Sequence, residues 1–208
     1  MKRFLTATCA AVLVIAVSAN AEDLYPPPWR TTPAGAPPTT YQVWEFNTSA
    51  NPAAPDFVAN AYGMPSATIE VGTWLPTYLS ATGVWHFEDY IALDIPNRPV
   101  PDERKEIWLQ ITYLNDTSQG GAPYQAPEIA LVPDAVGSEY LLAYYQLGDF
   151  YHAVYSITIE PSPYQETIYI LPRGCAVYVD EVVVDTRCIP EPLSALLLSV
   201  AGLLIRRR

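Results

Sequence analysis

The stretch Asp89-Tyr90-Ile91-Ala92-Leu93-Asp94-Ile95 decides the fold class of this chain. Ile91, Leu93 and Ile95 fall on one side of an extended chain, because successive side chains of a strand point in opposite directions. The residues between them fall on the other side, and such alternation is typical of a sheet with one buried face. The stretch Glu106–Tyr113 repeats the pattern, so the chain contains more than one strand of this kind.

The body of the chain, residues 41–187, favours strands over helices throughout. Its apolar runs are short and end at turn residues, and the 21 prolines of the chain would interrupt a helix almost anywhere. We therefore predict an all-β fold, an antiparallel β-sandwich of two sheets with a jelly-roll-like topology. The further strands expected are Tyr41–Phe46, Ser66–Val71, Gly83–Phe87, Glu128–Val132, Glu139–Gln146, Ala153–Glu160, Glu166–Leu171 and Ala176–Thr186.

The last of these strands changes its phase in the middle. Val177 and Val179 share one face, whereas Val182 and Val184 continue on the opposite parity. The break falls at Asp180-Glu181, and a β-bulge explains it more economically than a hairpin would. We expect a single bulged strand.

The N-terminus carries the features of a secretory signal peptide, which covers residues 1–21. A positive start at Lys2-Arg3 precedes the almost unbroken apolar stretch Phe4–Val17. Small residues at Ala19 and Ala21 then occupy the two positions that signal peptidase reads, which predicts cleavage after Ala21. An N-terminal membrane anchor is the alternative, but the apolar stretch is shorter than the ~20 residues that a spanning helix needs.

Residues 22–40 are predicted to be a proline-rich linker. Tyr25-Pro26-Pro27-Pro28 opens this segment, and Thr31–Thr40 holds further prolines. Such a composition favours an extended chain without a regular element. We expect the folded structure to begin at Tyr41.

The C-terminus combines three blocks in an uninterrupted order. Pro190, Glu191 and Pro192 come first, and the prolines end the preceding strand because neither can donate to a β-ladder. The apolar stretch Leu193–Ile205 follows and would span only about 20 Å as a helix, less than the hydrocarbon core of a bilayer. Three basic residues close the chain and favour the cytoplasmic face of a membrane: Arg206, Arg207 and Arg208.

This tail resembles the PEP-CTERM sorting signal of exported proteins in Gram-negative bacteria, and we assign residues 188–208 to it. The resemblance implies that Pro190, Glu191 and Pro192 are recognised by an exosortase, a membrane-embedded cysteine transpeptidase. It also implies a precursor held transiently in the inner membrane by the C-terminal helix and a mature protein at the cell surface or outside the cell. The alternative interpretation is an ordinary short tail anchor or a buried terminal helix.

The charge of the body limits its partners. Residues 22–189 hold 6 basic and 21 acidic residues, a net charge of −15. Such a surface repels the phosphates of nucleic acids and anionic lipid head groups. We therefore expect no nucleic-acid partner.

Two cysteines, Cys175 and Cys188, remain after removal of the signal peptide. A disulfide between them is a hypothesis suited to an oxidising compartment. The bond would require a chain reversal, because a straight strand of this length holds the two Cα atoms roughly 40 Å apart. The bulged strand that we expect provides no such reversal.

Acidic residues near the first and last strands offer a candidate calcium site, made of Glu45, Asp180 and Glu181. Calcium prefers six to eight oxygen ligands, and no ligand loop accompanies these residues. The alternative is a set of solvated surface carboxylates. We expect no cofactor other than this structural ion.

The sequence shows no catalytic signature, so we expect a protein that is not an enzyme. His86 and His152 lack the neighbours of a zinc motif, and both are interpreted as packed or solvent-facing residues. A convergent pair of carboxylates would leave no pattern in the chain, which keeps a secreted glycan-active hydrolase as a third hypothesis.

Aromatic residues supply the second hypothesis, a carbohydrate-binding module. The run Tyr140–Tyr145, together with Tyr151 and Tyr155, could stack against sugar rings if the side chains were exposed, although tyrosines also fill sandwich cores. The first hypothesis remains an exported structural or adhesive protein of the cell surface or matrix. The resemblance of the tail adds exopolysaccharide as an expected partner, alongside signal peptidase and exosortase as processing enzymes.

Overall fold

The structure is a computed structural model that describes residues 23–30, 35, 38–98, 103–132 and 138–190. All its strand pairs are antiparallel, so the predicted all-β antiparallel class is confirmed. The expected signal helix and C-terminal hydrophobic helix lie outside these residues. Within them, no helix has the length and hydropathy of a membrane span.

The elements in chain order are β1 (Thr39–Trp44), β2 (Phe57–Ala59), β3 (Ser66–Tyr78), β4 (Ala81–Pro96), β5 (Glu103–Asn115), the 3-10 helix η1 (Thr117–Gln119), β6 (Glu128–Val132), β7 (Ser138–Leu147), β8 (Phe150–Ile159), β9 (Gln165–Leu171) and β10 (Val177–Pro190).

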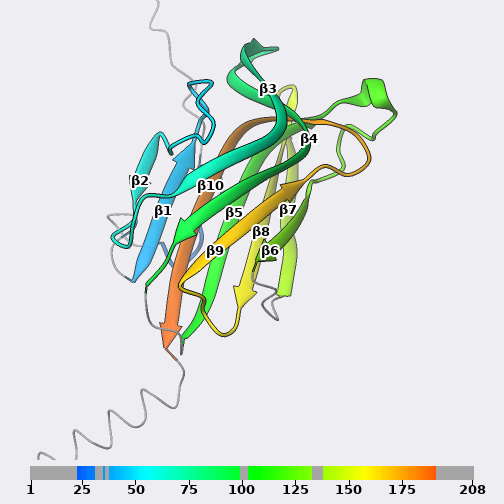
Figure 1. Ribbon diagram of the computed structural model, residues 1–208. Coiled ribbons are helices and arrows are strands. Elements are labelled where there is room, and N and C mark those ends of the chain that lie inside the picture. Colours follow the sequence, from blue (N-terminus) through cyan, green and yellow to red (C-terminus); the bar gives the residue numbers. More distant parts are fainter. Residues whose placement is uncertain (1–22, 31–34, 36–37, 99–102, 133–137, 191–208) are drawn as a thin grey trace, which may run out of the picture.

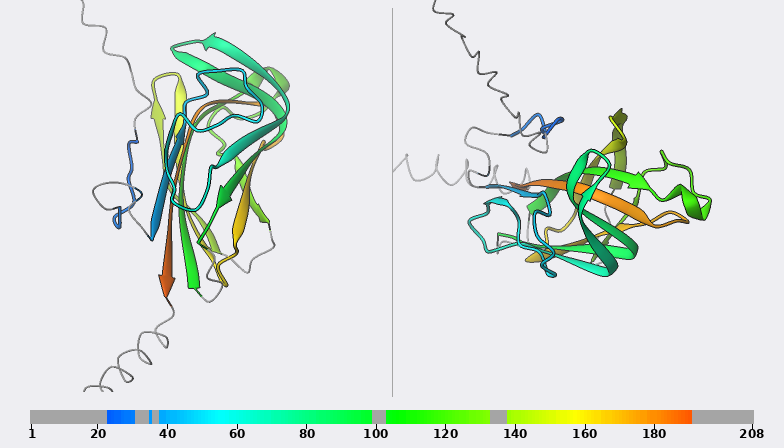
Figure 2. Two further views of the ribbon diagram at one scale, coloured as in Figure 1. Left: turned by 60° about the vertical axis from the view of Figure 1, so that its left-hand side comes forward. Right: turned by 90° about the horizontal axis from the view of Figure 1, so that it is seen from above.

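The strands belong to one continuous 10-stranded sheet, where the sequence predicts two separate sheets. The main path runs β6-β9-β4-β10-β5-β8-β7, while β1 and β2 extend from β10 and β3 extends from β4. The sheet curls so strongly that the half with β3, β4 and β9 faces the half with β1, β10 and β5, as Figure 1 and Figure 2 show. The result is a half-barrel whose two halves enclose a common core.

The two halves join where β4 lies beside β10. The first residues of β10, Val177–Val179, pair with Trp85–Phe87 of β4. Beyond this point β4 pairs with β9, and β1 takes the place beside β10. The register of β10 against β5 shifts between Val179 and Glu181, which confirms the predicted bulge. Because a bulge bends its strand and increases the local twist, it turns β10 away from β4 and curls the sheet.

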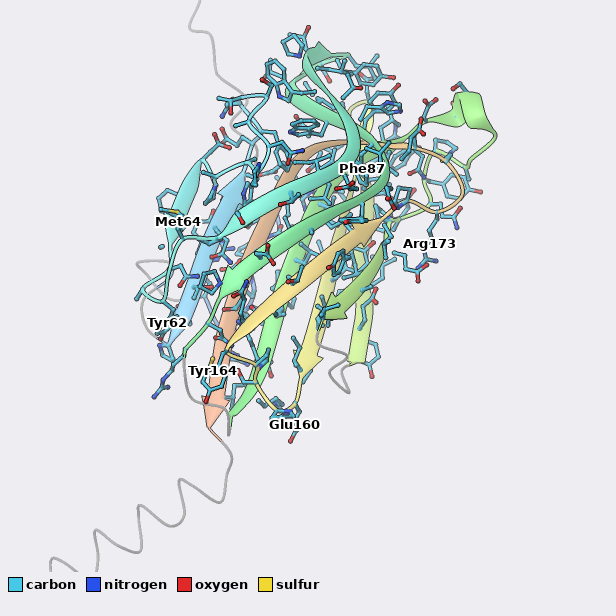
Figure 3. The ribbon with its side chains drawn as sticks, viewed as in Figure 1. Tyr62, Met64, Phe87, Glu160, Tyr164 and Arg173 are labelled. Carbon is cyan, nitrogen blue, oxygen red and sulfur yellow. The ribbon has the colours of Figure 1, made fainter. Side chains whose placement is uncertain are left out.

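The core lies on the concave side of the curled sheet. Ile91, Leu93 and Ile95 are fully buried, as their alternation predicts. Phe87, which sits at the junction of the two halves (Figure 3), is also fully buried. Burial of each such side chain stabilises the fold by about 1.5–3 kcal/mol. The opposite halves contribute Ile107, Leu109, Ile111, Tyr155, Ile157, Val182 and Val184 from one side and Ala67, Ile69, Ile168 and Ile170 from the other.

Gly83 is required where the β3–β4 hairpin packs against the end of β1. Its φ is +76°, and a Cβ atom would lie 2.4 Å from the carbonyl oxygen of Phe46. We predict that Gly83→Ala lowers the free energy of unfolding by about 3 kcal/mol, because backbone would have to move. Gly148→Ala is the matched control, since Gly148 has φ +61° with open space around it. We expect this substitution to lower the free energy of unfolding by about 1 kcal/mol. Equal losses in urea unfolding would contradict this steric argument.

Candidate functional site

The strand β7 carries several exposed large apolar and aromatic side chains. Among the described residues it pairs with β8 alone, and it therefore forms an edge of the sheet. Tyr140 is 61% exposed, and four further side chains of the strand are exposed by 39% or more. Exposed apolar groups gathered on one element mark an interaction surface more often than scattered ones do. We call this surface the β7 edge; it consists of Tyr140, Leu141, Leu142, Tyr144 and Leu147. Its side chains project to both sides of the sheet, because Tyr140 pairs with Ser156 and Tyr144 pairs with Ala153, which point in opposite directions.

The predicted aromatic run does not act as one unit. Tyr144 is 41% exposed and stacks on Tyr151, with ring centroids 5.6 Å apart and an interplanar angle of 9°. Tyr145 points to the other side of the sheet and lies against His152. Tyr155 belongs to the core, where its hydroxyl donates to the carbonyl oxygen of Pro127. Only part of the run is therefore available to a ligand.

A buried polar region lies on the convex side of the sheet, opposite the core. Gln110, His152 and Asp185 are almost completely buried there, together with the apolar Val154 and Val183. These residues do not belong to the central core cluster. Something other than the facing half of the sheet must therefore cover them.

The cover is the segment Asp23–Arg30, which we call the N-terminal strap. Figure 2 shows it on the side of the sheet away from β4 and β9. The amide of Tyr25 donates to Gln110 Oε1 over 3.0 Å, and Trp108 Nε1 donates to the carbonyl oxygen of Tyr25 over 2.8 Å. Gln110 Nε2 in turn donates to Asp23 Oδ1. Part of the predicted linker is thus held against the sheet by specific hydrogen bonds.

Arg30 anchors the end of the strap. Its Nε donates to Asp185 Oδ1 over 2.8 Å, and its other nitrogens pair with Asp185 and Asp23. The guanidinium also lies over the ring of Tyr41, 4.4 Å from the centroid. Burial raises the pKa of Asp185 to about 6, although Arg30 opposes that shift. The pair is therefore a buried one, which depends on both partners being present.

His152 links the strap to the sheet through a chain of hydrogen bonds. Its Nδ1 lies 2.9 Å from Thr112 Oγ1, and its Nε2 lies 3.3 Å from Gln110 Oε1. Because an amide oxygen only accepts, Nε2 carries the proton and Nδ1 accepts from the threonine hydroxyl. Burial lowers the pKa of His152 to about 4, so the ring is neutral at physiological pH.

The other histidine, His86, lies on β4 and pairs with Tyr178 of β10, close to the bulge. His86 Nε2 is 3.2 Å from Asp116 Oδ2, and its ring stacks on Tyr178 at 4.2 Å. Tyr78 stacks on the same tyrosine at 4.0 Å. Hydrogen bonds from Ser118, with a smaller effect of His86, lower the pKa of Asp116. His86 is thus fixed by an aromatic stack and a carboxylate.

The residues of the calcium hypothesis are only partly brought together. Glu45 accepts from Asn47, and its charge adds to burial in raising the pKa of Asp180 to about 6. Glu181 is buried, on the other side of the bulge. In the part of the chain that the structure describes, no group of three or more His, Cys, Asp or Glu side chains is arranged to hold a metal ion. The calcium site stays a prediction.

Cys175 and Cys188 are both buried and are not joined by a disulfide. Cys175 precedes β10, whereas Cys188 lies near the end of that strand, and β10 runs between them without a reversal. Pro190 is still part of the ladder, opposite Glu103 of β5. The remaining predicted processing residues, Ala19, Ala21, Glu191, Pro192, Arg206, Arg207 and Arg208, lie outside the described residues.

No family model, no curated protein and no solved structure matches this chain. The case for a function therefore depends on the residues of the chain itself. Sequence reasoning missed the N-terminal strap, whose only signal is a single tryptophan and a single arginine, Trp29 and Arg30, within a proline-rich stretch.

The strap anchor can be tested by a double-mutant cycle. We predict that Arg30→Met lowers the free energy of unfolding by about 3 kcal/mol, because it leaves the Asp185 carboxylate buried without a cation. In an Asp185→Asn background the same substitution should cost less than about 1 kcal/mol. Urea unfolding of the four proteins gives the coupling, and additive effects would contradict a direct pair.

The neutral His152 predicts a pH dependence. A histidine whose folded pKa lies below its unfolded value destabilises the fold as the pH falls through that interval. The free energy of unfolding, taken relative to His152→Gln, should fall by about 3 kcal/mol between about pH 7 and about pH 4. Asp180 and Asp185 change the free energy of unfolding in the opposite direction as the pH falls. The comparison cancels their contributions, because the wild-type protein and the variant both retain them. A pH-independent difference would show that His152 is not buried as a neutral ring.

Proposed function

We propose that the chain is an exported, exosortase-processed protein of the cell surface or extracellular matrix, with an adhesive and non-catalytic role. The signal peptide and the resemblance of residues 190–208 to a PEP-CTERM signal support export and processing. The body supports the adhesive role, because the β7 edge offers exposed apolar side chains at the border of the sheet. This edge is the single observation that carries the adhesive part of the proposal.

The position of the tail fits this proposal. β10 remains paired up to Pro190, so the first residue of the Pro-Glu-Pro motif belongs to the last strand of the body. A processing enzyme that cuts near the motif would release the body without leaving a long tail. The net charge of −15 between residues 22 and 189 would keep the released body soluble and away from anionic lipids.

A carbohydrate-binding role is the second candidate, favoured by Tyr144 on the β7 edge. Tyr140 and Tyr144 are exposed on opposite sides of this strand, and the stack of Tyr144 on Tyr151 fixes the orientation of the Tyr144 ring. Tyrosines present a large apolar area at a low cost in conformational entropy and retain a hydroxyl for hydrogen bonds. Matrix exopolysaccharide is the ligand that this arrangement would take.

Processing is tested by intact mass spectrometry of the protein recovered from native cells and medium. We predict a released species that lacks residues 1–21 and the apolar tail Leu193–Arg208. Replacement of Pro190, Glu191 and Pro192 by alanine should retain the tail and shift the protein to the membrane fraction. Recovery of the complete tail in the wild-type protein from the medium would refute the processing step.

Ligand binding is tested by affinity electrophoresis in gels that contain the exopolysaccharide of the same cells. We predict that Tyr144→Ala weakens retardation about fivefold, because a stacking contact between its ring and a sugar ring is worth of order 1 kcal/mol. Tyr164→Ala is the matched control, since Tyr164 is 62% exposed but lies in the loop before β9 (Figure 3). Equal retardation of the wild-type protein and both variants would leave adhesion to a protein surface as the role of the β7 edge.

A further inference from the structure

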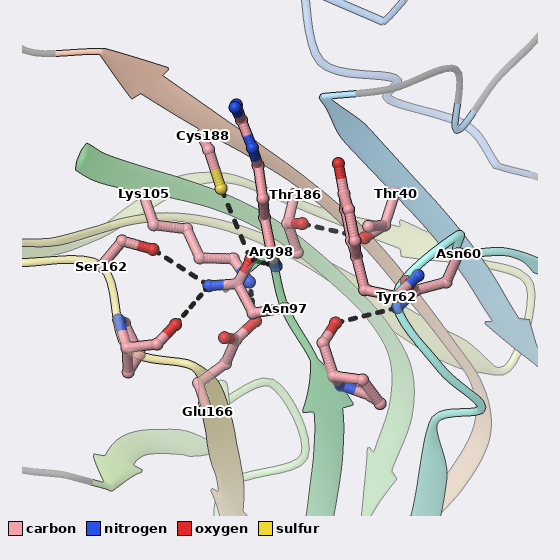
Figure 4. Close-up of polar contacts among 12 residues, drawn as sticks. Thr40, Asn60, Tyr62, Asn97, Arg98, Lys105, Ser162, Glu166, Thr186 and Cys188 are labelled. Atoms are coloured by element: carbon pink, nitrogen blue, oxygen red, sulfur yellow. Dashed lines mark hydrogen bonds and ion pairs between the residues drawn. The ribbon is translucent and has the colours of Figure 1, made fainter. Parts of the chain in front are cut away.

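A buried polar cluster lies at the end of the core where β10 approaches Pro190 (Figure 4). Lys105 of β5 and Glu166 of β9 are both fully buried, and Lys105 Nζ pairs with Glu166 Oε1. The two residues come from opposite halves of the curled sheet. Charged groups are rarely buried so completely, because removing them from water is costly.

Asn97 lies in the same cluster and is held by its complete set of hydrogen bonds. Its Oδ1 accepts from the amide of Arg98 over 2.8 Å and from Cys188 Sγ over 3.4 Å. Its Nδ2 donates to Ser162 Oγ over 3.0 Å and to the carbonyl oxygen of Pro163 over 2.6 Å. The side-chain amide therefore has a fixed orientation, with two donors on its oxygen.

Strand pairing brings this amide to the lysine. Cys188, which contacts Asn97, is the direct cross-strand partner of Lys105. On the other half of the sheet, the backbone N–H of Asn97 donates to the carbonyl oxygen of Tyr164, two residues before Glu166. Figure 4 shows the ends of the Lys105, Asn97 and Glu166 side chains directed toward one another.

Burial changes the protonation of the pair in the direction that a reaction would need. It lowers the pKa of Lys105 and raises the pKa of Glu166, while the attraction between the two groups opposes both shifts. Proton transfer from the ammonium to the carboxylate is therefore easier here than in water. It leaves a neutral amine, which is a nucleophile, beside a carboxylic acid, which can donate a proton.

We propose that Lys105 and Asn97 form an intramolecular amide bond, with Glu166 as the catalytic acid and base. The Lys105 Nζ atom attacks Cγ of Asn97 after its proton has passed to Glu166. The oxygen of the tetrahedral intermediate is stabilised by the Arg98 amide and the Cys188 thiol, which already donate to it.

The second half of the reaction releases ammonia. Glu166 returns its proton to Nδ2 of Asn97, the Cγ–Nδ2 bond breaks, and the new Nζ–Cγ bond remains. The attacking nitrogen loses its second proton to the Glu166 carboxylate and thence to the solvent or the departing ammonia. One amine and one amide give one substituted amide and ammonia, so no oxidant, metal or co-reactant is needed.

The bond would join the end of β4 to the beginning of β5, and thus one half of the curled sheet to the other. This is the end from which β10 continues toward Pro190. Any pull on the tail of the chain reaches the body here. Asn97 and Lys105 are already joined through residues 98–104, so the bond would add a shorter connection between the ends of their side chains. That connection would limit how far the two halves can separate after the hydrogen bonds of the sheet have opened.

The experiment is mass spectrometry of the full-length chain and of its peptides under reducing and denaturing conditions. Relative to the sequence, the bond predicts a mass lower by one ammonia, about 17 Da. Cleavage after glutamate separates Asn97 from Lys105 in an unlinked chain, because Glu103 and Glu106 flank Arg104-Lys105. In the linked chain, the peptide Arg104-Lys105-Glu106 stays attached to the peptide that contains Asn97.

Three variants connect the mass change to the proposed groups. Lys105→Arg and Asn97→Ala remove the reacting groups, and Glu166→Gln removes the proton carrier, so all three should show the unreacted mass. Arg104→Gln is the matched control, since Arg104 lies on the same strand but is 45% exposed, and it should retain the link.

Two results would overturn the proposal. One is the full sequence mass in the folded wild-type protein, which is decisive even if a variant fails to fold. The other is a loss of about 18 Da with Lys105 joined to Glu166, which would identify the carboxyl and not Asn97 as the acceptor. Neither result depends on export, tail removal or glycan binding, so failure here is distinguishable from failure of the proposed function.

Discussion

The bulge in β10 is the constraint on which the rest of the structure depends. Before it, Val177–Val179 pair with β4; after it, β10 pairs with β1 while β4 continues beside β9. A regular strand would keep β4 as its neighbour along its full length and would give a flatter sheet. By dividing the sheet into two facing halves that remain joined, the bulge creates the concave core.

The curled sheet is a single layer, so the side chains on its convex side would be exposed to solvent unless another segment covered them. The N-terminal strap solves this for β5, β8 and β10 by covering Gln110, His152 and Asp185 with hydrogen bonds and one ion pair. Buried polar groups of this kind are stabilising only when all are satisfied, so strap and sheet depend on each other. Within the described part of the chain the β7 edge has no comparable cover, and Tyr140, Leu141, Leu142, Tyr144 and Leu147 remain exposed.

The two buried polar regions have different chemical characters. On the convex side, Arg30 pairs with Asp185, and Thr112 and Gln110 form hydrogen bonds with the neutral ring of His152. At the end of the core, an amine, a carboxyl and a fixed carboxamide meet in a dry environment. Low dielectric strengthens every interaction in such a site, which suits it to chemistry as well as to stability.

The sequence by itself determined the all-β class, the burial of Ile91, Leu93 and Ile95, and the bulge at Asp180-Glu181, because alternation and its phase are local properties of a strand. It predicted two sheets where one curled sheet forms, since strand neighbours depend on contacts far apart in the chain. The same limit hid the strap and the Lys105–Glu166 pair, whose partners are 61 or more residues apart. Only the tertiary structure could bring these groups together, because no local pattern records which side chains a curled sheet will place face to face.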